Sequence, residues 1–289
     1  MDWITSLQRI IDYIEEHILE DIDLEKIGGI NYSISYLQKI FNVVCNMSIS
    51  SYVKMRRMTL AANEVLFTDK EISDIAFSYR YKNTESFSRA FKNFHGVNPS
   101  VARARHAKLR NFSPIHLKLD ITGGNSLNYK IIEKDSFNVI EKIERQPVLE
   151  NEDFKSVINY WRRSHRNGTI KKLLKTTKDK KHFYGIYYDN TIDSDSVEYS
   201  VAVMDDNNSI LPEGFHKRTI PKRTWAVFEC VGPMPKAMQK LWHEIWTEVF
   251  PTALYKPTGE FEIEVYNDGN EKDKNYHCEA WVSIKKKQN

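Results

Sequence analysis

The chain has 289 residues, of which 41% are hydrophobic and 28% are charged, and its formal net charge is +3. This composition excludes collagen-like, low-complexity and disordered chains, and the length suits one large domain or two ordinary ones. No run of 18 apolar residues occurs, so the sequence predicts no membrane span. The three cysteines have unrelated spacings, which indicate neither a disulfide framework nor a metal site. We therefore expect a cytoplasmic protein without a metal or another cofactor.

The positive charge is concentrated in one region. Residues 26–118 hold 15 Lys and Arg against 5 Asp and Glu, whereas residues 119–289 hold 26 of each kind. A basic block beside a neutral one indicates that the first region binds a polyanion. A solvated basic face gives the same counts, so charge alone leaves both interpretations open.

The first 111 residues follow the 3.6-residue period of amphipathic helices and show no strand-like alternation. They are expected to form an all-α domain. Two segments, 23–41 and 72–94, each combine a short helix, a tight turn and a helix that starts with polar residues. Each is typical of a helix-turn-helix, whose second helix enters the major groove of DNA. The expected helices cover about 4–18, 33–41, 50–67, 72–76 and 84–95, with Ser33 as an N-cap and Gly96 as a C-terminal stop.

The pattern changes after residue 111. Residues 112–127 contain Pro114 and a Gly-Gly pair, which is typical of a linker. Residues 128–289 then alternate strands and helices in the order ββαββ, repeated once, which predicts an α+β domain with an antiparallel sheet and helices on one face. The expected strands are 129–134, 137–144, 182–189, 198–205, 215–220, 224–231, 261–266 and 277–284, and the expected helices are 151–163 and 235–249.

Three strings of the helical region resemble the AraC-type (AraC/XylS) DNA-binding domain: YSISYLQKIF (32–41), SISSYVKMRRMTLAANEVL (48–66) and SFSRAFKNFHGVNPS (86–100). The resemblance covers about residues 5–106. It implies tandem helix-turn-helix motifs that bind double-stranded promoter DNA, with RNA polymerase as a further candidate partner. Because both motifs lie in one chain, we expect a monomer on DNA.

The resemblance also assigns DNA-contacting residues. Gln can bond adenine, Arg or Lys can read guanine, and Glu can accept from cytosine. For each position taken alone, an exposed polar side chain without a role is the competing interpretation. The first recognition helix presents Ser35, Tyr36, Gln38 and Lys39; the second presents Thr84, Glu85, Ser86 and Arg89; the expected phosphate anchors are Arg56, Arg57, Lys82, Lys92 and Arg103.

The sequence departs from the family pattern in the turns. The stretch with Gly28 and Gly29 is one residue shorter than usual, which alters how the first motif is built. Arg80 stands where the family usually has glycine, so this turn must either be strained, at about 1 kcal/mol, or take a different form.

The second half resembles the GyrI-like effector-binding domain over about residues 127–286, through its duplicated ββαββ order and the stretches PEGFHKRTIPKRTWAVFECVGP (212–233) and FEIEVYNDGN (261–270). The combination with an AraC-type domain is similar to the Rob-like branch of that family. It implies a cleft between two halves, lined by aromatic rings around a carboxylate.

A carboxylate among aromatic rings suits a hydrophobic cation. Strand parity places Glu279 with Trp281, and Glu262 with Glu264 and Tyr266. Against this, strand acids usually face solvent and tryptophans four residues apart on a helix are usually core. The candidate ligand-binding residues are Glu262, Glu279, Trp281, Trp225, Tyr187, Trp242 and Trp246.

The sequence thus favours a DNA-binding transcription regulator, not an enzyme, whose second domain senses a hydrophobic, neutral or cationic small molecule. Two alternatives stay open. One is a small-molecule hydrolase in which Glu262 and Glu279 act as general base and partner. The other is a drug-sequestering protein with a vestigial DNA-binding half. The sequence contains no P-loop, nucleophile elbow or GxGxxG motif.

Overall fold

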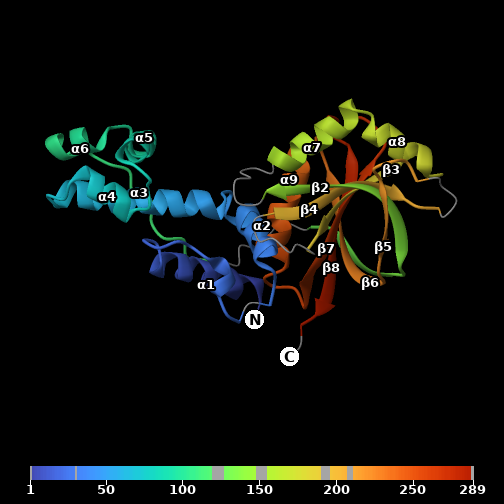
Figure 1. Ribbon diagram of the computed structural model, residues 1–289. Coiled ribbons are helices and arrows are strands. Elements are labelled where there is room, and N and C mark those ends of the chain that lie inside the picture. The colour runs from blue at the N-terminus through green and yellow to red at the C-terminus, as the bar shows by residue number, and fades with distance from the viewer. Residues whose placement is uncertain are drawn as a thin grey trace. The chain divides into compact units, whose positions relative to one another are not determined.

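The computed structural model describes residues 2–29, 31–118, 127–147, 155–189, 196–206 and 211–287. Their contacts form two compact units, drawn in Figure 1. The first unit comprises Trp3–Asn31 and Ser48–Lys118, and the second comprises Asp2, Tyr32–Met47 and Leu119–Asn289. The segment Tyr32–Met47 therefore groups with the second half of the chain. The boundaries expected at residues 111 and 128 stay a prediction, and residues 119–126 of the expected linker lie outside the described residues.

The first unit is all helical, as expected. One hydrophobic cluster packs apolar residues of four of its helices together, with Met58, Phe87 and Phe91 fully buried. The last of these helices begins with Pro99 and was not predicted, because it is only seven residues long. The elements are α1 (Trp3–Glu16), η1 (Leu24–Lys26), α3 (Ile49–Phe67), α4 (Ile72–Ser78), α5 (Thr84–His95) and α6 (Pro99–Arg105).

Local chemistry sets the ends of α4 and α5. Asn83 caps α5 by accepting a hydrogen bond from the backbone of Ser86 at 2.8 Å, and Gly96 ends it at φ +85°. Arg80, in the turn between α4 and α5, has φ +66°, so this turn keeps the left-handed conformation without a glycine. The first motif differs, because its expected opening helix is only the 3₁₀ turn η1.

The second unit contains α2 (Ile34–Cys45) and an eight-stranded antiparallel sheet. Ser33 caps α2 by accepting from the backbone of Tyr36 at 3.1 Å. The strands follow the order β1-β6-β8-β7-β3-β4-β2-β5. They are β1 (Tyr129–Lys134), β2 (Phe137–Pro147), β3 (His182–Tyr188), β4 (Ser196–Met204), β5 (His216–Ile220), β6 (Arg223–Val231), β7 (Tyr255–Asn267) and β8 (His277–Lys286).

This order confirms the expected duplication. The strands β1 to β4 form the first half and β5 to β8 the second. Each strand of one half lies as far from the centre of the sheet, between β7 and β3, as its counterpart in the other half lies on the opposite side. The two halves are therefore related by a pseudo-twofold operation between β3 and β7. The first strand of each half pairs with the second strand of the other half. The two halves are thereby joined into one continuous sheet.

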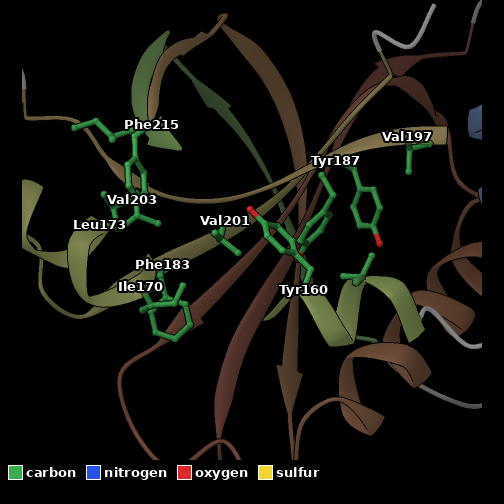
Figure 2. Close-up of a cluster of buried hydrophobic side chains, with 12 residues drawn as sticks. Tyr160, Ile170, Leu173, Phe183, Tyr187, Val197, Val201, Val203 and Phe215 are labelled. Carbon is green, nitrogen blue, oxygen red and sulfur yellow. The ribbon is translucent and has the colours of Figure 1, made fainter. Parts of the chain in front are cut away.

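Helices cover one face of this sheet. The helices α7 (Lys155–Arg166) and α8 (Thr169–Thr176) contact β2 and β4, whereas α9 (Lys236–Glu244) contacts β6 and β8 and continues into a π-helical turn, η3 (Ile245–Val249). Only one helix was expected in place of α7 and α8, and its first residues, 151–154, lie outside the described residues. Figure 2 shows the buried cluster under α7 and α8, which includes Tyr160, Leu173, Phe183 and Tyr187.

Candidate functional site

Helix α5 presents an exposed polar strip. Phe87 and Phe91 bury one side of the helix, which leaves Glu85 and Arg89 exposed on the other side. The Ser86 hydroxyl is less available to donate to another molecule, since it donates to the backbone carbonyl of Asn83 at 2.9 Å. Further exposed cations flank the strip. They are Lys82 and Lys92, while Thr84 is half-buried.

The side chains expected to read bases from α2 are buried. Ser35 contacts Asp189, which directly follows β3, and Lys39 contacts Glu262 of β7. Tyr36 packs edge-on against Trp246 with ring centroids 6.0 Å apart. Gln38 is also buried. None of these four side chains faces solvent, so they can contact DNA bases only if α2 moves away from the rest of the second unit.

Three of the five expected phosphate anchors have internal partners. Arg56 is buried and forms a bidentate pair with Glu15, with Nη2 and Oε2 2.8 Å apart. Burial of Glu15 acts to raise its pKa, but the hydrogen bonds from Arg56 and Tyr52 outweigh that effect and lower the pKa. Arg57 donates to the carbonyls at residues 18 and 20, and Arg103 donates to the carbonyl at residue 65. These guanidinium groups therefore hold the first unit together.

The second unit contains a cleft of about 730 Å³ between α7 and α9. Aromatic side chains form much of its wall: Trp161 from α7, Phe183 and Tyr187 from β3, Trp242 from α9 and Tyr266 from β7. Helix α2 closes one side with Lys39 and Val43. Flat apolar walls of this kind bind aromatic or aliphatic ligands.

A carboxylate, Glu264, lies in this cleft and is 5% exposed. It accepts hydrogen bonds from Trp242 Nε1 at 2.8 Å, from the Tyr199 hydroxyl at 2.8 Å and from the Tyr266 hydroxyl at 3.0 Å. Burial raises the pKa of Glu264 even though these hydrogen bonds favour its charged form. The cleft thus holds a fixed acidic group whose charged form is stabilised by a nearby cation.

A second carboxylate lies behind the cleft wall. Glu262 is 1% exposed and forms an ion pair with the ammonium group of Lys39, which is 6% exposed. The Lys39 Nζ atom lies 3.9 Å from the centroid of the Tyr187 ring and 5.2 Å from that of Trp242. Lys39 and Tyr187 line both the cleft and a small inner cavity that Glu262 helps to form. Lys39 is therefore placed between the cleft and Glu262.

The remaining expected ligand residues lie elsewhere. Glu279 pairs across the strands with Val265, on the face opposite to Glu262, where it accepts from Trp281 Nε1 at 2.7 Å. Trp225 packs against Trp281 on that same face, with ring centroids 5.9 Å apart. Trp246 is buried in η3. The expected pairing of Glu262 with Glu279 in one site is thus not what the structure shows, because the two strands place them on opposite faces.

The candidate ligand residues named from the sequence leave out much of the cleft lining, including Glu264 and Trp161. Glu264 has the same strand parity as Glu262, so parity was the available signal. Trp161 lies on the apolar stripe of α7, which a periodicity argument assigns to the core. Within the described ranges, no helix is long and apolar enough to cross a membrane, and no group of three or more His, Cys, Asp or Glu is arranged to hold a metal ion.

Known proteins resemble both halves of the chain. Residues 130–284 match the family model described as integron-associated effector binding protein (Cass2), and residues 29–105 match a helix-turn-helix domain. The HTH-type transcriptional regulator YbfP of Bacillus subtilis is 35% identical over 99 residues, which are 34% of this chain and 34% of YbfP. The chain thus spans about a third of the length of that relative.

The regulatory protein SoxS of Salmonella typhimurium is 34% identical over 100 residues, which are 34% of this chain and 94% of SoxS. Among solved structures, SAV2435 bound to tetraphenylphosphonium aligns with a TM-score of 0.49 and 21% identity, over 55% of this chain and 94% of that chain. The Cass2 match covers more than half of the chain, and SoxS is matched over almost its whole length. The chain therefore belongs to the Cass2-type, GyrI-like effector-binding family and carries an AraC-type helix-turn-helix domain in front of that domain.

Proposed function

We propose that the protein is a sequence-specific DNA-binding transcription regulator whose cleft senses a hydrophobic cation. One observation carries this proposal: the same chain holds an exposed recognition helix, α5, and an aromatic cleft with the buried carboxylate of Glu264. The partner is double-stranded promoter DNA, with RNA polymerase as a further candidate. Two motifs in one chain suit a monomer on DNA.

The geometry of α5 supports DNA binding. Its buried phenylalanines fix which side of the helix faces outward, and Arg89 stands exposed on that side. An arginine there can donate two hydrogen bonds to guanine, whereas Lys82 and Lys92 supply charge for phosphates. The N-terminal cap at Asn83 keeps the first turn of α5 regular, and this turn is the part that enters the groove.

The charge distribution of the cleft supports a cation. Its cationic side chains on α7, Arg162 and Arg166, are exposed, so water and salt screen them. The buried charges are Glu264, Glu262 and Lys39, which sum to one negative charge when both acids are ionised. Contact with each aromatic ring adds about 0.5–2 kcal/mol for a cation. A ligand that is both aromatic and positively charged uses all of these features.

The same geometry disfavours the hydrolase alternative. Glu262 and Glu279 lie on opposite faces of the sheet, so they cannot act on one substrate as base and partner. Glu264 has donors on both of its oxygens: Trp242 Nε1 on one, and the hydroxyls of Tyr199 and Tyr266 on the other. We therefore propose a binding role for this cleft.

Two matched ions test the proposal on the full chain. Tetraphenylphosphonium and tetraphenylborate have nearly the same shape and opposite charge, so calorimetric titration with both separates charge from size. We expect the cation to bind more tightly by at least about tenfold. DNA binding is tested by titrating a fluorescent fragment of the upstream region of its own operon against a scrambled fragment at two salt concentrations.

Equal affinity for the two DNA fragments would contradict sequence-specific recognition and favour the drug-sequestering alternative. A preference for tetraphenylborate would contradict the cation assignment. Affinity for the operator fragment should also fall steeply as salt rises, because several phosphates are neutralised in the complex.

A further inference from the structure

The acidic group behind the cleft, Glu262, is a candidate binding site in its own right. It lies on β7 opposite Tyr187 of β3, on the face of the sheet that the helices cover. Its carboxylate is almost fully buried and its ion-pair partner comes from α2. A cation beside an ionised carboxylate in such a place offsets the cost of burying its charge.

The cation beside Glu262 is the ammonium group of Lys39, and its surroundings are those of a bound organic cation. The Lys39 ammonium meets the carboxylate of Glu262 and, at 3.9 Å, the face of the Tyr187 ring. A carboxylate and aromatic faces around one positive charge are the features by which proteins recognise organic ammonium ions. Because Lys39 also lines the cleft, a ligand cation in the cleft lies next to it.

Polar contacts attach α2 to the same unit near both of its ends. Ser33, its N-cap, donates to the carboxylate of Asp189, and Ser35 reaches the same carboxylate at 3.5 Å. Near the other end, a ring nitrogen of His243 lies 3.0 Å from the carbonyl oxygen of Val43. The ion pair between Lys39 and Glu262 is buried and joins α2 to β7. Loss of this pair therefore weakens the attachment of α2 strongly.

We propose that Glu262 is an inner cation subsite, which Lys39 fills in the free protein and which a hydrophobic organic cation takes over. The incoming cation competes with Lys39 for the same carboxylate, and two positive charges at that spot repel each other. Displacement of Lys39 frees α2, whose base-reading side chains are buried in the attached state. This inference rests on the proposed function, because it requires that the cleft binds cations.

The energetic sense of the exchange follows from charge. Taking Lys39 away from Glu262 without replacement leaves a buried, unpaired carboxylate, which is strongly unfavourable. A ligand cation supplies the missing charge and in addition covers the aromatic wall of the cleft. A neutral ligand of the same shape supplies only the second contribution, so it binds without releasing α2.

The test uses the full chain, tetraphenylphosphonium and the substitution Lys39→Met, which keeps an unbranched side chain and removes its charge. We expect Lys39→Met to bind the cation at least about tenfold more tightly than wild type, because Glu262 is then open to it. Adding Glu262→Gln to Lys39→Met should abolish that gain. The matched control is Lys54→Met, which makes the same charge change at an exposed position of α3 and should keep the wild-type affinity.

Hydrogen exchange of the wild type gives a second measurement that needs no substitution. Saturating tetraphenylphosphonium should increase amide exchange in residues 34–45, whereas tetraphenylborate should not. Cation binding with the same affinity in wild type and Lys39→Met, together with unchanged exchange in 34–45, overturns the inference and leaves the proposed function intact. Absence of cation binding in every variant overturns both, so the two failures are distinguishable.

Discussion

Substitution of Glu264 by glutamine should lower the affinity of the cleft for cations and leave its affinity for neutral ligands almost unchanged. Glutamine has the shape of glutamate: its amide oxygen can accept from Trp242 Nε1, and its amide NH2 group can donate to the hydroxyl oxygens of Tyr199 and Tyr266, which now donate to the other carboxylate oxygen. The substitution therefore removes the charge and little else. Thermal unfolding of the variant provides the control for folding.

The magnitude follows from the geometry of the cleft. A cation resting against the Trp242 ring, whose Nε1 donates to Glu264 at 2.8 Å, has its centre roughly 6 Å from the carboxylate. At an effective dielectric constant of about 20, this separation gives roughly 2–3 kcal/mol of attraction. The expected loss of affinity is therefore about 30- to 100-fold for tetraphenylphosphonium.

Because the charge of Glu264 attracts the cation, the affinity of the cleft for cations should depend on pH. Burial raises the pKa of Glu264, so its charge, and with it the affinity for a cation, is lost as pH falls through that pKa. Wild type should bind tetraphenylphosphonium more tightly at pH 8.5 than at pH 5.5, and the ratio of wild type to Glu264→Gln should shrink towards one at the lower pH. The other side chains of the cleft are the same in both proteins, so their effects cancel in that ratio. A ratio near one at pH 8.5 would refute the electrostatic account.

Three further predictions concern DNA binding, folding and the attachment of α2. Arg89→Ala should weaken binding to the operator by about 1–3 kcal/mol and binding to random DNA much less, as measured by fluorescence anisotropy; equal losses on both would make Arg89 a phosphate contact. Arg56→Leu should destabilise the protein to urea by about 3 kcal/mol, because it leaves the Glu15 carboxylate without its main partner, and an unchanged urea midpoint would contradict this role. Asp189 has a pKa raised by burial to about 6, so its protonated form is favoured by folding, and the stability it contributes is full below its unfolded pKa and disappears as pH rises through 6. Asp189→Asn, which cannot titrate, should therefore gain stability relative to wild type between pH 5 and pH 8, by about 1.4 kcal/mol, and parallel pH profiles would argue against it.

Much of the fold was predictable because its signals are local. The strand over residues 129–134 and the helix that starts at Thr84 occur as expected, since alternation and capping are encoded within a few residues. Helix α8 escaped prediction because it is only eight residues long and largely basic. The repeated ββαββ order of elements predicted the duplication although the two halves share no sequence repeat, and the strand order in the sheet reflects that duplication.

The candidate site was less predictable because it depends on contacts between distant segments. Parity alone could not say which face of the sheet the helices cover, so Glu279 and Glu262 looked equivalent. The resemblance assigned Lys39 to DNA, and nothing near it in the sequence indicates a partner more than 200 residues away in Glu262. The internal partner of Arg56 is equally remote in sequence, so its role in folding was not visible either.

If cation binding in the cleft and DNA binding share one equilibrium, as proposed above, each must change the affinity of the other by the same factor. Tetraphenylphosphonium should be titrated into the wild-type chain in the absence of DNA and again with saturating operator DNA. Because coupling between two binding sites is reciprocal, DNA should tighten cation binding by the same factor by which the cation tightens DNA binding. We expect that factor to be about 5–150, as for other coupled sites. Identical cation isotherms with and without operator DNA would contradict the account, because they would show that the two sites bind independently.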